Sequence, residues 1–165
     1  MSVTIYATGG TGVNIGMQVA DLDTNIHFID TSNSNLAKHR GENVYLVEGM
    51  DGAGKDQSVT YNHFKGQAGD VLTKFKPSEH LNIVVTSLTG GSGAILGALI
   101  AKELITQDFN TVVIGVISRS SLVELRNARN ALMTYKAMSK QTDRCYPIFI
   151  IDEEQRTDAD RQALG

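Results

Sequence analysis

The segment Ile83–Ala94 has the sequence IVVTSLTGGSGA, in which β-branched residues lead into a loop that contains three glycines. Such residues are typical of strands, and the largely apolar stretch Ile95–Leu104 that follows is long enough for a buried helix. Glycines between a strand and a helix let the backbone approach a ligand, while the first amides of the helix favour an anion. The segment therefore predicts a strand–loop–helix unit that grips phosphate, although Gly90–Gly93 could also serve only close packing of helix on strand.

A second glycine-rich segment, Thr8–Gly16, follows the strand-like run Val3–Ala7. Gly10 and Gly12 supply a G-x-G pattern, and Asp30 lies twenty residues further on, where an acid that binds the ribose of NAD is expected. Taken alone, this loop fits either a phosphate-binding site or a plain tight turn. An NAD-dependent oxidoreductase is therefore one alternative for the function.

A third segment, Gly49–Lys55, satisfies the G-x-x-x-x-G-K pattern of nucleoside monophosphate kinases. Asp56 stands where that phosphate loop has the Ser or Thr that binds Mg²⁺, and a carboxylate there would face phosphate charge. The stretch 57–69 that follows has low helix propensity and predicts at best a poor helix. A P-loop nucleotide kinase is a second alternative.

Strand-like and helix-like runs alternate along the whole chain. This order predicts a three-layer α/β domain with a mostly parallel, Rossmann-like sheet of about six strands and helices on both faces. Apolar residues three and four apart predict a long amphipathic helix over Leu122–Met138. Ligands of such sheets bind beyond the carboxyl ends of the strands, where the glycine loops lie. The predicted strands are Val3–Ala7, Asn25–Ile29, Val44–Val47, Ile83–Ser87, Val112–Ile117 and Ile148–Ile151.

Length and composition set further limits. A chain of 165 residues fits a single domain, here 1–165. A net charge of −3 argues against nucleic-acid binding, which normally needs a basic face. The single cysteine, Cys145, excludes an internal disulfide and is expected in the core. Because no targeting segment is evident and the longest apolar stretch, 94–105, is too short to span a bilayer, we expect a cytoplasmic protein without membrane contact.

Together, the loops resemble those of the tubulin/FtsZ superfamily, in the same order and over essentially the whole chain. Ile83–Gly93 resembles the signature loop, Gly9–Asn14 resembles the first phosphate loop, and Gly52–Gly54 resembles the loop that senses the γ-phosphate. Arg119 falls where the family places a ribose-contacting loop. Glu153 falls where the family places a residue that contacts guanine, and this residue is typically Asn in the family. The signature loop is shorter than the family pattern G-G-G-T-G-[ST]-G.

The resemblance implies a domain that binds GTP or GDP with Mg²⁺, in a cytoskeletal protein that self-associates head to tail into filaments. A phage or plasmid relative is favoured over a division protein. The family's central helix and activation domain, whose loop supplies the catalytic acids, are absent from this chain, so no catalytic residue is expected in it. A nucleotide-free module that keeps the fold is the third alternative. The residues implied to bind nucleotide, metal or ribose are Gly9, Gly10, Thr11, Gly12, Asn14, Asp30, Thr31, Gly52, Ala53, Gly54, Lys55, Thr89, Gly90, Gly91, Ser92, Gly93, Arg119 and Glu153.

Overall fold

The computed structural model describes residues 1–20, 25–37, 41, 43–48 and 57–153 of the chain. Six strands in these ranges form one parallel sheet in the order β3-β2-β1-β4-β5-β6. The alternating sequence pattern is thereby confirmed. The strands are β1 (Val3–Thr8), β2 (Asn25–Asp30), β3 (Val44–Leu46), β4 (Leu81–Ser87), β5 (Thr111–Ile117) and β6 (Ile148–Asp152).

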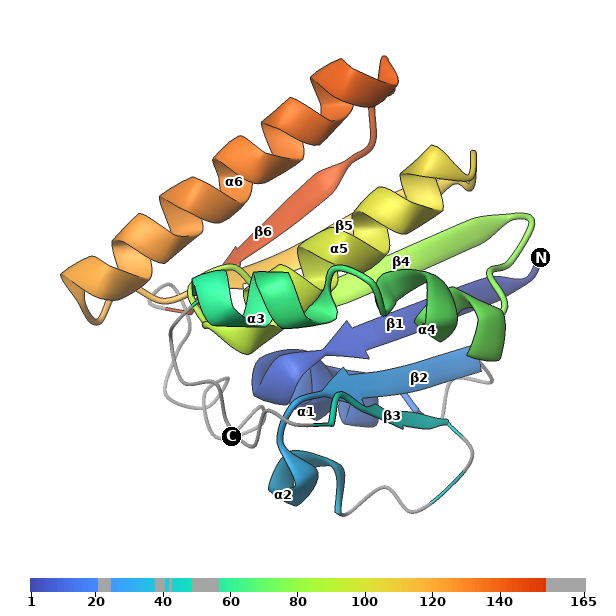
Figure 1. Cartoon of the computed structure of the whole chain (residues 1–165), viewed down its shortest axis with the longest axis horizontal. Coiled ribbons are helices and arrows are strands. Elements are labelled where there is room, and N and C mark those ends of the chain that lie inside the picture. The colour runs from blue at the N-terminus through green and yellow to red at the C-terminus, as the bar shows by residue number, and fades with distance from the viewer. Residues whose placement is uncertain (21–24, 38–40, 42, 49–56, 154–165) are drawn as a thin grey trace.

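Helices lie on both sides of the sheet and give the expected three layers (Figure 1). One side carries the first two helices and the other side carries the remaining four. In chain order they are α1 (Gly9–Gln18), α2 (Asn33–Leu36), α3 (Gln57–Phe64), α4 (Ala68–Lys74), α5 (Ser92–Thr106) and α6 (Leu122–Thr142).

Two helices differ from the sequence-based expectation. The stretch 57–69, predicted to be a poor helix, contains the whole of α3 and the start of α4. Its low propensity is overcome because both helices pack against α5, and packing supplies most of the stability of short helices. The last helix runs four residues beyond Met138 and ends at Thr142, and its C-cap Asp143 adopts a left-handed conformation with φ 52°.

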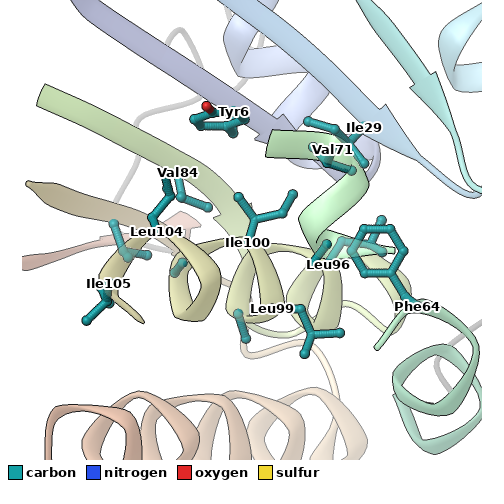
Figure 2. Close-up of a cluster of buried hydrophobic side chains, with 14 of the residues drawn as sticks. Tyr6, Ile29, Phe64, Val71, Val84, Leu96, Leu99, Ile100, Leu104 and Ile105 are labelled. Atoms are coloured by element: carbon teal, nitrogen blue, oxygen red, sulfur yellow. The ribbon is translucent and has the colours of Figure 1, made fainter. Parts of the chain in front are cut away.

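The larger core lies between the sheet and α5 (Figure 2). Leu96, Ile100 and Leu104 are fully buried on this helix, and Val84 is fully buried on β4, which faces it. Tyr6 is also fully buried, and its hydroxyl donates a hydrogen bond of 2.7 Å to the carbonyl oxygen of Phe75. This packing fixes α5 against the two central strands, and so it fixes the position of the glycine loop from which α5 begins.

A buried histidine lies at the edge of the same core. His27 on β2 is 5% exposed and stacks on Phe75, with ring centroids 4.1 Å apart and planes inclined by 10°. Neither ring nitrogen has a hydrogen-bond partner among the described residues. Burial, and to a smaller extent the positive charge of Lys74, together lower the pKa of His27 from 6.5 to about 4. The folded protein therefore holds this imidazole in its neutral form at pH 7.

We expect His27 to make the fold acid-sensitive. Because the pKa lies near 4 in the folded state and near 6.5 in the unfolded state, the unfolded chain binds more protons between these values. The contribution of neutral His27 to the free energy of unfolding should thus be present above pH 6.5. The free energy of unfolding should fall by about 1 kcal/mol from pH 7 to pH 5.5. Urea denaturation at both pH values measures the difference. His27→Phe keeps the stack on Phe75 and should abolish this part of the pH dependence; an unchanged dependence would contradict the assignment.

Candidate functional site

Two helix N-termini meet at the carboxyl ends of β1 and β4. Gly9, the first residue of α1, has φ +67°, and a Cβ built on it would lie 2.5 Å from the Cα of Gly93 in the first turn of α5. The backbones of the two loops are therefore in direct contact. Neither helix has a side-chain hydrogen bond at its N-cap, which is Thr8 in α1 and Gly91 in α5. Two sets of first-turn amides thus converge on one place, which favours an anion.

Two buried threonines hold this junction. The hydroxyl of Thr8 donates to the carbonyl oxygen of Gly93 at 3.1 Å, and the hydroxyl of Thr86 donates to the same oxygen at 2.7 Å. Thr8 therefore bonds to the neighbouring helix and leaves its own helix uncapped. Both side chains are fully buried. The two hydroxyls fix the start of α5 relative to β1 and β4.

A cavity of about 200 Å³ extends from these helix starts across the ends of β4, β5 and β6. It brings together residues from four parts of the chain that are far apart in the sequence. Two carboxylates line it, so the cavity suits hydrogen-bond donors such as hydroxyl or amino groups. The residues that line it are Thr11, Ser87, Thr89, Gly90, Val116, Ser118, Glu124 and Glu153.

The structure places the predicted site residues in three groups. Gly9, Gly10, Thr11, Gly12 and Asn14 lie in the first turns of α1, and Thr89 to Gly93 form the loop and first turn of α5. Of these, Thr11, Thr89 and Gly90 line the cavity together with Glu153. Asp30, Thr31 and Arg119 lie at strand ends outside this lining. Gly52, Ala53, Gly54 and Lys55 lie outside the described residues.

Asp30 closes a compact turn after β2. One carboxylate oxygen accepts from the backbone amides of Thr31 at 2.7 Å and Ser32 at 3.2 Å, and the other accepts from the side-chain amide of Asn35 at 2.8 Å. Asp30 is 1% exposed. The hydroxyl of Thr31 is buried beside it without a hydrogen-bond partner among the described residues. Asp30 therefore shapes the loop next to α1, because Asn35 also lies against Gly10.

Arg119 lies just beyond β5, with its side chain half exposed, and forms an ion pair with the carboxylate of Asp152 at the end of β6. This pair joins the two strand ends beside Glu153.

Ser87, Val116, Ser118 and Glu124 line the cavity but were not among the predicted site residues. A signal for the last was present, since Ser121 and Glu124 form the S-x-x-E pattern of a capping box. The hydroxyl of Ser121 indeed accepts from the Glu124 amide at 3.2 Å. The pattern fixes the start of α6, and the sheet order then places Glu124 at the ligand edge.

Two further features concern metals and membranes. Within the ranges that the structure describes, no three His, Cys, Asp or Glu side chains are grouped as a metal site. No helix there has the length and apolar character needed to cross a bilayer.

Cys145, expected in the core, is exposed. This expectation was wrong because Cys145 follows α6 at the amino end of β6, where the chain turns on the surface.

No protein-family model matches the sequence. The chain is, however, similar to two phage proteins. It is 32% identical to the phage tubulin-like protein of Pseudomonas phage PhiPA3 and 31% identical to that of Pseudomonas phage 201phi2-1, over 140 residues in both cases. Each alignment covers 84% of this chain and 44% of the relative. The chain thus spans less than half the length of these relatives.

Solved structures agree with these relatives. A protofilament of TubZ from bacteriophage PhiKZ superposes with a TM-score of 0.89 and 26% identity, covering 98% of this chain and 53% of that one. The phage tubulin PhuZ with GDP gives a TM-score of 0.88 and 28% identity, covering 97% and 51%. The similarity spans the sheet and the loops at its carboxyl edge, and neither an NAD-dependent oxidoreductase nor a P-loop kinase is favoured by it. The chain belongs to the tubulin/FtsZ superfamily.

Proposed function

We propose that this domain binds a guanine nucleotide at the edge where α1 and α5 begin. The observation that carries the proposal is the contact between Gly9 and Gly93, which brings two uncapped helix N-termini together. A single N-terminus binds one phosphate, whereas two that converge can grip a polyphosphate from both sides. The structural neighbour PhuZ, solved with GDP, supports a guanine nucleotide as the ligand.

In this proposal the phosphates bind to the amides of 10–14 and 90–94, with the hydroxyls of Thr11, Thr89 and Ser92 beside them. Gly52–Lys55 would contact the terminal phosphate. Asp30 or Thr31 would bind ribose or Mg²⁺. Such an ion usually takes only one or two protein oxygens and completes its shell with phosphate oxygens and water. The lack of a three-residue metal cluster among the described residues fits this mode of binding.

The nucleoside would occupy the cavity beyond the phosphates. Glu124 and Glu153 both line this cavity, and their negative charge disfavours phosphate there. Their oxygens can accept hydrogen bonds from ribose hydroxyls and from the N1 and N2 groups of guanine. We assign Glu153 to the base, and Arg119 to ribose or phosphate. Adenine offers no N1 hydrogen, so this arrangement favours guanine.

We further propose that the complete protein assembles head to tail into filaments. Two of the solved relatives are a protofilament of TubZ and a filament of PhuZ201. This chain covers about half of each of them, and we assign it nucleotide binding. We assign no catalytic residue to this chain. Hydrolysis would use catalytic acids from a further loop. The cytoplasm, where such filaments have both nucleotide and subunits, is the proposed location.

Thermal unfolding with and without nucleotide tests the binding proposal. A ligand at 100 times its Kd stabilises the native state by about 2.7 kcal/mol, which raises the Tm of a domain of this size by roughly 5–10 °C. We expect this shift with GTP or GDP in the presence of Mg²⁺, and a much smaller one with ATP or NAD. Equal shifts with ATP or NAD would reject the guanine assignment. No shift with any ligand would favour a module that has lost its nucleotide.

A further inference from the structure

Asn127 is a buried amide on a helix face that otherwise packs through apolar groups. It is 7% exposed, and the other buried positions of α6 are Ala128, Ala131, Tyr135 and Met138. A polar group costs free energy when it is buried, and the cost is offset only by a well-placed hydrogen bond. The partner of this amide therefore indicates what the residue does.

The side-chain amide of Asn127 donates to the backbone carbonyl oxygen of Thr89 at 3.2 Å. Thr89 lies in the glycine loop that leads from β4 into α5, and it is 5% exposed. The bond therefore joins α6 to the proposed phosphate loop, across 38 residues of sequence. Asn127 lies one turn of α6 after Glu124, which lines the cavity.

The carbonyl of Thr89 and the amide N–H of Gly90 belong to one rigid peptide plane. The carbonyl is held by Asn127, and the N–H donates to the hydroxyl oxygen of Ser87 at 2.9 Å. Opposite edges of this plane are therefore tied to two different elements, α6 and β4. Gly90 and Gly91 offer little conformational resistance of their own. The orientation of this plane sets the direction in which the chain turns into α5.

We propose that Asn127 is a positioning residue of the nucleotide site: it holds the Thr89–Gly90 peptide so that the amides of Gly91–Gly93 are oriented before the ligand arrives. The inference rests on the proposed function for its effect on binding, and on geometry alone for its effect on the loop. Without this donor the Thr89 carbonyl loses its buried partner, and the hydroxyl of Ser87 alone still holds the peptide plane. The loop that leads into α5 is then less firmly oriented before nucleotide binds, and ordering it on binding weakens the affinity.

Asn127→Asp tests the proposal, because it keeps the shape and replaces the donor with an acceptor that faces a carbonyl. We expect amide hydrogen exchange at Gly90–Gly93 in the nucleotide-free protein to accelerate at least tenfold, and the Kd for GDP to rise on the order of tenfold or more. Asn130→Asp places the same charge on an exposed position of the same helix, and should leave both values near those of the parent. This control separates lost positioning from repulsion of an anionic ligand.

Met138→Ala supplies the second control, since it truncates a buried side chain far along α6 and destabilises the helix without touching the loop. If Met138→Ala loosens the loop as much as Asn127→Asp does, the role of Asn127 is structural only and the proposal is wrong. Unchanged exchange and Kd in Asn127→Asp would also overturn it. If the parent protein binds no guanine nucleotide, the proposed function fails, while the exchange measurement still decides the role of Asn127.

Discussion

Gly12→Ala is expected to destabilise the fold by about 3 kcal/mol or more. A Cβ at this position would lie 2.4 Å from the carbonyl oxygen of Val85, and 3.2 Å from the carbonyl carbon of Ala7. Both atoms belong to the backbones of the central strands β4 and β1, so neither can move without breaking the sheet. The only relief is withdrawal of α1 from the sheet, which would also remove one of the two helix N-termini from the site.

Urea or thermal denaturation of the full chain measures this loss. Gly66→Ala is the matched control, because Gly66 lies in a turn and a Cβ there has nothing within 4 Å. This control should stay within about 0.5 kcal/mol of the parent, as exposed substitutions generally do. A stability for Gly12→Ala within 1 kcal/mol of the control would show that α1 is not in close contact with the sheet.

Gly9→Ala is expected to weaken nucleotide binding on the order of 100-fold. This loss is larger than destabilisation of the fold alone would cause. The φ of +67° costs an alanine about 1–2 kcal/mol, and its Cβ would lie 2.5 Å from the Cα of Gly93. The starts of α1 and α5 must then separate. Their amides would no longer converge on the same phosphates, so the grip from two sides would be lost.

Calorimetric titration with GDP and Mg²⁺ measures this effect. Gly10→Ala is the neighbouring control: its Cβ would meet only the end of the Asn35 side chain, at 3.2 Å, and that side chain can adjust. We expect less than a threefold change in Kd for Gly10→Ala, since its amide remains. Equal losses for the two variants would mean that the contact with Gly93 does not set the affinity.

The sheet was predictable from the sequence because its strands are short β-branched runs separated by helical ones. The same holds for the ligand edge, since each glycine loop follows a strand and parallel strands end at one edge. The sequence could not show at which of these glycines an added Cβ would clash with neighbouring atoms. Gly9, Gly10 and Gly12 look equivalent in the sequence, and only the approach of Gly93 and Val85 distinguishes them.

Side-chain partners were also beyond sequence reasoning. Asp30 was assigned to ribose from its spacing and to metal from the family resemblance, yet its oxygens accept from the Thr31, Ser32 and Asn35 donors of its own loop. That assignment stays a prediction. Asn127 carried no signal, because a polar residue on a helix is usually solvated, and its partner Thr89 is supplied by a distant loop. Burial and pairing of this kind arise from the tertiary fold, which local patterns do not encode.

The strand order has a consequence for how the molecule is assembled. β1 pairs with β4, so Val3 lies opposite Leu81, while β2 and β3 are inserted on the outer side of β1. Closing such a long loop costs chain entropy before any contact repays it, and parallel pairing of distant strands is a slow step in folding. During synthesis, β1 and α1 therefore wait for β4 and α5 to emerge. Nucleotide can act as a folding template only after that late pairing, because the anion-binding edge does not exist before it.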